Sequence, residues 1–573
     1  MKKITHTDWV NIDNDFVFTQ IHVPNSKVAL NKAVIIVGPL GPEYMFCHRS
    51  IKSLAERIAS LGLYSLRYDH IGMGNSSSDL FDTNIVSKWN ATLPVLKEHL
   101  KHFYSIDDVI YISLRTGSLI LSEYLNKYES VHAIFWFPYV LGKAWVRDMR
   151  MMDSKRNNVN KSSTTIDAAG YPLTFEAQEE INQVNLLDNN LNVSGNILLI
   201  EDSLSLPNKK LANYFNEFTE TDIKSTPGMK EMLTVVSSSV VPLLSLDTIC
   251  QWLDTLRNET EKITCPECEA PLGTYQDDFF KESIHNLNGK KNLFGIISEP
   301  LSCNYDDIVL IVNAGSGHHV GPNRLNVDLA RYLASVNIAS FRFDLGHLGE
   351  SIHGDETSKL NPFVASTNND IQYVIEYITG KYKKNIILLG LCSGAHNQFH
   401  AALNTTSKFI KQLIVINPIN FYYKDGQSLE ASEVAELQVA EENYNKNVFS
   451  FNKWMSLISN PRKLIKVVNS VFIILLSKLS NLKQNLLFKL GGSPQQQLDK
   501  DMLSLVKKGI NIAIINSEGD PGHKILINEA PVFVRKFQAS QNLLVKKIQS
   551  SDHNFTTRNS KNELFRVISE VIK

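Results

Sequence analysis

The sequence predicts two α/β domains in tandem, each built on a doubly wound and mostly parallel β-sheet. Two observations predict this fold class: a repeat that relates the halves of the chain, and β-branched apolar runs that alternate with helical segments. A third observation, a strand that leads into a glycine-flanked turn and then a helix, places candidate chemistry in the second half. The length of 573 residues also requires more than one hydrophobic core.

The two copies of the repeat are related by a constant offset of 275 residues. Each copy contains an apolar helical segment, a strand that ends in aspartate and a turn of the form Gly-x-Ser, at residues 54–60, 66–69 and 74–76 and again at residues 329–335, 341–344 and 349–351. An apolar run and a glycine-rich loop precede each copy. This order of elements is typical of a βαβ unit in a parallel sheet.

Apolar runs without polar alternation predict strands that helices cover on both faces. They lie at residues 33–37, 109–112, 133–137 and 196–200 in the first half and at residues 308–312, 385–389, 412–416 and 511–515 in the second. We therefore expect a first domain over residues 1–260, a linker over residues 261–290 and a second domain over residues 291–573.

The composition is that of an ordinary globular protein, with 43% hydrophobic residues and a formal net charge of −1. No basic run with interleaved aromatic residues is present, which disfavours a nucleic-acid partner. The N-terminal residues include no apolar signal stretch, and six cysteines are few for this length, so we expect a cytoplasmic protein with free thiols. Cys265 and Cys268 form one CxxC pair. Because a zinc ribbon needs a second pair, an exposed linker is favoured over metal binding, and we expect no metal and no cofactor.

The candidate nucleophile is Cys392, in the segment LLGLCSGA at residues 388–395. This pattern is typical of a nucleophile elbow with cysteine in place of the usual serine, and glycines flank the apex because a side chain there would collide with neighbouring backbone. The N-terminus of the following helix would favour a thiolate. The alternative is a buried structural cysteine.

The matching segment of the first half, SLRTGS at residues 113–118, carries Arg115 at the apex. Arginine stays protonated in proteins and cannot act as a nucleophile. In addition, no histidine occurs between His132 and His285 to serve as a base. The first half is therefore predicted to be a non-catalytic copy that packs against the second or shapes its substrate channel.

The base and the acid are expected after the elbow, in the chain order nucleophile, acid, histidine. His553 follows an apolar strand at residues 543–545 and precedes the final helix, so it is favoured over His396, His400 and His523. Asp520 follows the strand at residues 511–515 and is the favoured acid. Glu518 is the reserve, and an ordinary Gly-Asp-Pro turn is the alternative interpretation.

Backbone N–H groups would stabilise the oxyanion of an acyl-transfer reaction. One is expected from Ser393, directly after the nucleophile, and the other from Gly315 or Ser316 in the loop after the first strand. Residues 418–505 form a long insertion that we expect to be a helical lid over an acyl pocket. Its apolar run at residues 471–476 is far too short to span a bilayer, so stable membrane insertion is not expected, although peripheral membrane contact stays an alternative.

Three blocks resemble αβ-hydrolase-like proteins associated with exosortase and natural-product gene clusters. They are NAGSGHHVGPNR at residues 313–324, FYYKDGQSL at 421–429 and AGYPL at 169–173. The resemblance implies the αβ-hydrolase fold, supports Cys392, Asp520 and His553 as a triad, and implies that an arginine-bearing first elbow is usual. In the first block, His318, His319 and Arg324 are candidate substrate-binding residues, and His319 stands where the related block has arginine.

These observations predict acyl-enzyme chemistry, as an acyltransferase or as a thioesterase-like hydrolase in a biosynthetic pathway. Cys392 would attack an ester or thioester, His553 would transfer the proton and Asp520 would orient the imidazole. The expected partner is an acyl substrate, with an acyl carrier protein or a CoA thioester as the candidate acyl donor. Two alternatives stay open: a non-catalytic acyl-binding scaffold, and a serine mechanism through Ser393, which lies one position past the apex.

Overall fold

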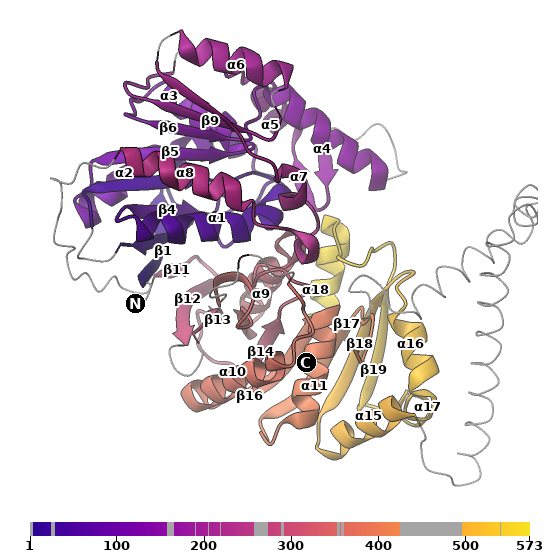
Figure 1. Cartoon of the computed structure of the whole chain (residues 1–573). Helices are drawn as coiled ribbons and strands as arrows, with labels where there is room; N and C mark the ends of the chain where they lie inside the picture. Colours follow the sequence, from indigo (N-terminus) through magenta and orange to yellow (C-terminus); the bar gives the residue numbers. More distant parts are fainter. Residues whose placement is uncertain are drawn as a thin grey trace, which may run out of the picture.

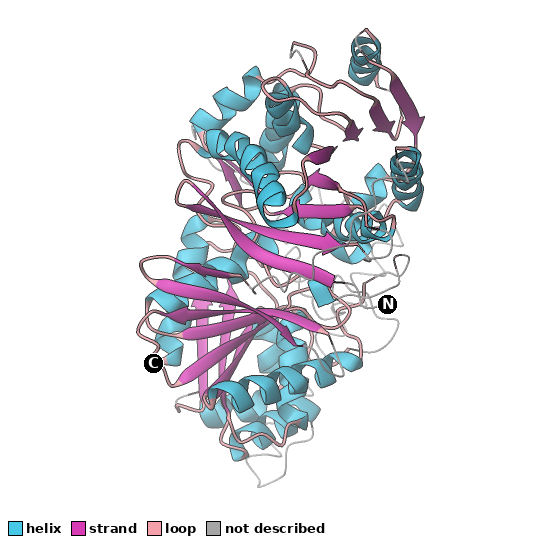
Figure 2. Ribbon diagram, turned by 90° about the vertical axis from the view of Figure 1, so that its left-hand side faces the viewer, coloured by secondary structure: helices cyan, strands magenta, loops and turns pink. Residues whose placement is uncertain are grey.

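The computed structural model describes two α/β units, one from each half of the chain (Figure 1). The described residues are 4–24, 29–156, 165–188, 191–203, 205–217, 219–256, 273–287, 292–351, 356, 360–423, 496–538 and 540–573. In Figure 2 helices flank the strands of each unit. Each unit has a core on both faces of its sheet, as the unbroken apolar strands predict.

The first unit is an eight-stranded sheet in the order β1-β2-β4-β3-β5-β6-β9-β10. Pairs β1–β2 and β2–β4 are antiparallel and the other pairs are parallel. The strands are β1 (Ile4–Ile12), β2 (Asp15–Val23), β3 (Lys32–Val37), β4 (Tyr64–Tyr68), β5 (Asp108–Leu114), β6 (Ala133–Trp136), β9 (Ile197–Glu201) and β10 (Thr221–Ser225).

Helices cover both faces of the first sheet. One face packs against α1 (Glu43–Ser60) and α8 (Leu243–Thr255), and the other against α2 (Ile85–Tyr104), α3 (Gly117–Leu125) and α6 (Leu206–Asn216). The remaining elements are α4 (Gly142–Arg156), α5 (Phe175–Gln183), α7 (Met229–Met232), a short helix at Val236–Ser238 and a hairpin of β7 (Ile166–Ala168) and β8 (Tyr171–Leu173).

The second unit is a nine-stranded sheet in the order β11-β12-β13-β15-β14-β16-β17-β18-β19. It is parallel from β15 to β19 and antiparallel at its other edge. The strands are β11 (Thr274–Gln276), β12 (Phe280–Leu287), β13 (Leu293–Pro300), β14 (Asp307–Val312), β15 (Ala339–Phe343), β16 (Asn385–Leu391), β17 (Ile410–Ile416), β18 (Asn511–Ser517) and β19 (Leu543–Ile548).

The helices of the second unit also form two layers. One contains α9 (Leu325–Ser335) and α18 (Arg558–Ile572), and the other α10 (Ser366–Tyr382), α11 (Ser393–Asn404), α15 (Gln497–Lys507), α16 (Gly522–Glu529) and α17 (Pro531–Phe537). Short helical turns lie at Pro322–Arg324 and Gly349–Ser351. No helix in the described part of the chain is long and apolar enough to cross a bilayer.

The eight strands predicted from apolar runs all form, but the predicted linker at residues 261–290 is partly wrong. Its C-terminal part forms β11 and β12 of the second sheet. The polar pattern there is misleading because the Glu282 carboxylate is buried, where it pairs with Arg331 and with Arg342, each at 2.8 Å or less. Cys265 and Cys268 lie outside the described residues.

The predicted lid falls mostly on residues 424–495, which lie outside the described residues, as does the apolar run at 471–476. The end of the predicted lid is instead a core helix. Leu498, Met502 and Leu505 of α15 recur at helical spacing and are buried in the layer that contains α11. The lid prediction is therefore wrong for α15, which is the connection between β17 and β18.

Buried polar contacts join the two units. Arg324 donates to the carbonyls of Gly74 and Ser78 at 2.9 Å each, so a second-unit side chain binds the Gly-x-Ser turn of the first. In the other direction, Arg67 and His48 of the first unit contact Glu350 in the Gly-x-Ser turn of the second, at 2.9 and 2.7 Å. The repeated turns are thus among the points of contact between the units, together with pairs such as Arg57 with Glu356 and Arg558 with Asp79.

Candidate active site

Cys392 lies at the apex of a sharp turn between β16 and α11. Its backbone has φ 58° and ψ −117°, a conformation that side chains rarely adopt. The flanking glycines are required: a Cβ at Gly390 would lie 2.3 Å from the carbonyl carbon of Gly394, and one at Gly394 would lie 2.7 Å from the Asn313 oxygen. The local sequence therefore forms the strained elbow that the GxCxG pattern predicts.

His553 and Asp520 lie together beside the elbow. The His553 Nδ1 is 2.6 Å from the Asp520 Oδ2, and the Asp520 side chain is buried. His553 also hydrogen-bonds the Cys392 side chain. Burial lowers the pKa of His553, but its hydrogen bonds to Asp520 and Cys392 and the charges of both outweigh this effect and raise the pKa to about 10. The three predicted residues thus form one hydrogen-bonded chain.

The alternative acid and bases lie elsewhere. Glu518 accepts a hydrogen bond from the Ser550 N–H at 3.0 Å, so it supports the histidine loop and leaves Asp520 as the partner of the imidazole. His523 is exposed on α16. The His396 and His400 rings lie 4.5 Å apart on α11 with their planes tilted by 48°, and His400 Nε2 contacts the Phe421 carbonyl at 2.7 Å. Burial lowers the pKa of His396 to about 3.

Asn417 is a site residue that the sequence analysis missed. It follows β17 with φ 42°, its Oδ1 accepts from the Ser517 N–H at 2.7 Å, and its Nδ2 donates to the His553 carbonyl at 2.8 Å. Asn417 therefore fixes the loop that carries the histidine to the strand that leads to the acid. Its signal in the sequence was the polar Asn-Pro pair directly after an apolar strand.

The predicted oxyanion residues lie at the elbow. The Gly315 N–H donates to Ser393 Oγ at 2.8 Å, and Ser316 Oγ donates to the Leu360 carbonyl at 2.8 Å. Ser393 is the first residue of α11, where backbone N–H groups lack partners within the helix. The buried Ser393 hydroxyl binds the loop after β14 and lies one position past the apex, which disfavours it as a nucleophile.

The three candidate substrate-binding residues lie at the contact between the units. His319 Nδ1 is 2.7 Å from Asp344 Oδ2, and its other ring nitrogen contacts the Asn75 amide at 3.0 Å. The buried His318 ring stacks on His48 with centroids 4.2 Å apart. Arg324 uses its donors on first-unit carbonyls. Each of the three therefore contacts the first unit, and His319 is also held by Asp344 of its own unit.

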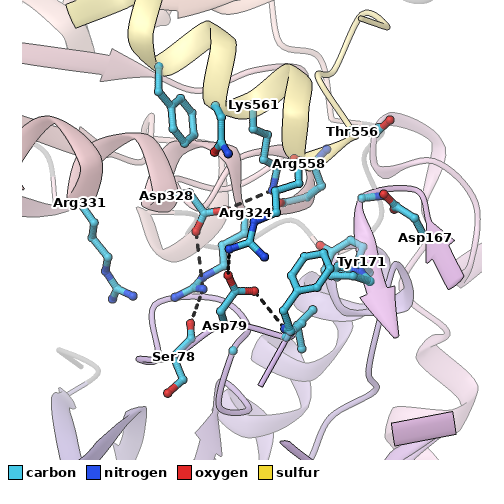
Figure 3. Close-up of a pocket in the computed structure, with 18 of the residues that line it drawn as sticks. Ser78, Asp79, Asp167, Tyr171, Arg324, Asp328, Arg331, Thr556, Arg558 and Lys561 are labelled. Carbon is cyan, nitrogen blue, oxygen red and sulfur yellow. Dashed lines mark hydrogen bonds and ion pairs between the residues drawn. The ribbon is translucent and has the colours of Figure 1, made fainter. Parts of the chain in front are cut away.

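Arg324 also lines a cavity of about 330 Å³ between the units (Figure 3). Its charged lining residues are the cations Arg324, Arg331, Arg558 and Lys561 and the anions Asp79, Asp167, Asp277 and Asp328. Several are paired: Lys561 with Asp328 at 3.2 Å and Arg558 with Asp79 at 3.4 Å. The balanced lining gives this cavity no preference for ligands of one charge.

Arg115 occupies the corresponding elbow of the first unit, with φ 53°. Its guanidinium pairs with Glu43 at 3.0 Å and lies 4.2 Å from the centre of the Tyr139 ring. A Cβ at Gly117 would lie 2.2 Å from the Val37 oxygen, so this turn needs its glycine too. The first unit keeps the shape of an elbow without a nucleophile.

The two units share their strand order and have an elbow at the same place, so they have the same fold. The chain is similar to the solved structure of Est1E from Butyrivibrio proteoclasticus with ferulic acid bound, at 14% identity over 43% of this chain and 97% of that chain, with a TM-score of 0.35. It is also similar to an α/β serine hydrolase homologue from Coxiella burnetii, at 13% identity over 51% of this chain and 97% of that chain, with a TM-score of 0.29. A third similar structure is an esterase from Pyrococcus furiosus, at 14% identity over 44% of this chain and 91% of that chain, with a TM-score of 0.32.

No protein-family model and no curated protein matches the chain. The assignment of the fold therefore rests on strand order, helix layers and the elbow. The narrower resemblance to proteins of exosortase and natural-product clusters stays a prediction.

Proposed function

We propose that the second unit catalyses acyl-enzyme chemistry with Cys392 as nucleophile, His553 as base and Asp520 as the group that orients the base. The observation that supports this proposal is the hydrogen-bonded chain of these three side chains at a strained elbow. Nucleophile, base and orienting acid within hydrogen-bond reach are the signature of covalent catalysis.

In the first half-reaction, His553 holds the proton of Cys392 Sγ, as its raised pKa favours, and the sulfur attacks the carbonyl carbon of an ester or thioester. The carbonyl oxygen carries the negative charge of the tetrahedral intermediate and accepts from backbone N–H groups. The Ser393 N–H is one donor. Because the Gly315 N–H already donates to Ser393 Oγ, the Ser316 N–H is the preferred second donor.

The intermediate then collapses. The bond to the leaving alcohol or thiol breaks, His553 gives that group its proton, and the acyl group stays on sulfur as a thioester. In the second half-reaction His553 removes a proton from water, an amine or an alcohol, which attacks the acyl carbon. The thiolate leaves beside the imidazolium, so the enzyme returns to its starting state with the proton on His553.

A cysteine nucleophile suits a thioester donor, because exchange between thiol and thioester conserves the bond type. We therefore propose an acyl chain on CoA or on a carrier protein as the donor, within a biosynthetic pathway. Asp520 lies at 2.6 Å from His553 and keeps the imidazole in the tautomer that accepts the sulfur proton.

Intact-protein mass spectrometry after incubation with acetyl-CoA and with p-nitrophenyl acetate tests the proposal. We expect one acetyl adduct on the wild type and none on Cys392→Ala, while Ser393→Ala keeps the adduct. A second readout is iodoacetamide labelling near neutral pH, in which Cys392 should react before Cys47, Cys250 and Cys303. No adduct on the wild type, together with equal labelling rates, would support a non-catalytic acyl-binding scaffold instead.

A further inference from the structure

The first unit has a pocket at its own elbow, which the proposed chemistry does not use. The pocket has a volume of about 320 Å³ and is lined by residues that follow β5, β6 and β9, together with parts of α4, α6 and α7. It therefore lies at the carboxyl ends of parallel strands, which is where ligands bind in open α/β sheets. Its size is within the range of small-molecule sites.

Arg115 forms one wall of this pocket, but its charge is already compensated. Its Nη2 and Nε atoms both contact the Glu43 carboxylate, at 3.0 to 3.3 Å, and its guanidinium lies over the Tyr139 ring. Arg115 is the one cation among the residues that line this pocket in the described part of the chain. The pocket thus lacks a free positive charge for an anionic ligand.

Glu201 also lines the pocket, and unlike Arg115 its charge is not compensated by a partner of opposite charge in the parts of the chain that the structure describes. It is the last residue of β9, only 4% of its surface is exposed, and its Oε1 atom has no hydrogen-bond partner among the described residues. Its carboxyl group hydrogen-bonds the Asn208 side chain, which lines the same pocket. A buried carboxyl oxygen without a donor is costly, and an N–H or O–H group on a ligand would satisfy it.

The other charged groups of the lining are acidic as well. Asp202 accepts from the Gly228 N–H at 3.1 Å, and Asp148 accepts from the Tyr139 hydroxyl at 3.1 Å. Arg115 is neutralised by Glu43 and Asp148 by Arg147 at 3.1 Å, so the negative charge of the lining comes from Glu201 and Asp202. Burial raises the pKa of Glu201 to about 7, against the opposing effects of the Asn208 hydrogen bond and the Arg115 charge, so a cation beside it would favour its ionised form.

We propose that this pocket binds a small aliphatic amine, whose ammonium group donates to Glu201 Oε1 while its carbon chain contacts the apolar lining. That lining includes Val140, Leu141 and Met229. The site is separate from Cys392, so the proposal stands or falls independently of the acyl-enzyme chemistry.

Isothermal titration of the full chain with n-butylamine tests the proposal, with 1-butanol as the neutral ligand of matched size. We expect saturable binding of the amine and binding of the alcohol that is weaker by roughly tenfold or more, the usual difference for a hydrogen bond to a charged group. Glu201→Gln keeps the size of the side chain and removes its charge, and should weaken amine binding by a similar factor. Cys392→Ala is the matched control and should bind the amine as the wild type does.

Far-UV circular dichroism shows whether Glu201→Gln is folded, and the comparison of amine with alcohol on the wild type needs no variant. The proposal is overturned if n-butylamine does not bind saturably to the wild type, if 1-butanol binds equally well, or if folded Glu201→Gln keeps full affinity for the amine.

Discussion

The chain carries two elbows of the same shape, one with cysteine at its apex and the other with arginine. Cys392 and Arg115 have φ angles of 58° and 53°, and each is followed by a helix and by a glycine that a carbonyl oxygen approaches too closely for any side chain. Yet Cys392 hydrogen-bonds His553, whereas Arg115 pairs with Glu43 of its own unit. A strained backbone is thus kept where no nucleophile is present, so strain alone does not identify a catalytic residue.

The residue after each apex helps to explain why both units have the strained elbow. Ser393 Oγ accepts from the Gly315 N–H at 2.8 Å, and Thr116 Oγ1 accepts from the Leu40 N–H at 2.6 Å. In both units a hydroxyl group therefore fixes the elbow to the loop after the first parallel strand. The elbow joins neighbouring strands of the sheet, and this role does not depend on the side chain at the apex.

The largest expected effect is a loss of acyl transfer, and it tests which of the two elbows supplies the nucleophile. Cys392→Ala should lower acyl transfer by about 10⁴-fold or more, because removal of a nucleophile leaves only binding and oxyanion stabilisation. Adding Arg115→Cys to this variant should restore nothing, because the one histidine after the first elbow in that unit, His132, directly precedes β6 and accepts from the Asn196 N–H at 3.0 Å. Single-turnover assays with p-nitrophenyl acetate measure both variants. Recovery of activity in the double variant would contradict the difference between the elbows.

The next effect concerns the base and the acid. His553→Asn should lower kcat/KM by about 10³-fold, within the usual range for general acid–base catalysis. Asp520→Asn should cost about 10²-fold, because it changes the tautomer preference but leaves the base in place. Glu518→Gln keeps an acceptor for the Ser550 N–H and is the matched control, with a nearly unchanged rate. A larger loss for Glu518→Gln than for Asp520→Asn would reverse the assignment of the acid.

A smaller effect is expected at Asn417, which positions the histidine loop. Asn417→Ala should lower kcat by about tenfold with little change in KM, since the hydrogen bond to the His553 carbonyl is worth about 1–3 kcal/mol when one buried partner is removed. Asn417→Gly relieves the positive φ and separates backbone strain from the hydrogen bonds. If Asn417→Gly is fully active, the side chain does not position the loop.

The smallest effect is a pH dependence of stability that only the second elbow should show. Because folding raises the pKa of His553 from 6.5 to about 10, its contribution to the free energy of unfolding is fully present below pH 6.5 and is lost as the pH rises through 10. The difference in unfolding free energy between wild type and His553→Gln should therefore shrink over this range, as urea denaturation can measure. The same difference for Arg115→Gln should stay flat, because arginine keeps its proton.

The parallel strands and the Cys392 elbow could be predicted because they depend on local sequence. Unbroken apolar runs mark strands that are buried on both faces, and Gly390 and Gly394 mark a turn whose sterics leave no room for side chains. The edge strand β12 was missed because its burial depends on partners far along the chain. Glu282 there looks like a linker residue until Arg331 and Arg342 neutralise it.

The contacts between the units could not be predicted from the sequence, because their partners also lie far apart along the chain. His319 and Arg324 belong to a polar sequence block beside the candidate site. Because their side chains carry hydrogen-bond donors, they were predicted to bind substrate. Their partners are Asn75 and backbone carbonyls about 250 residues away. Only the placement of one unit on the other brings these groups together, and no local pattern records that placement.

The binding of Arg324 to the turn of the first unit has a consequence for dividing the chain. The buried Arg324 guanidinium of the second unit donates to the Gly74 and Ser78 carbonyls of the first. Removal of the first unit would leave this charge without those acceptors. The second unit expressed alone should therefore be less stable than the same unit within the full chain.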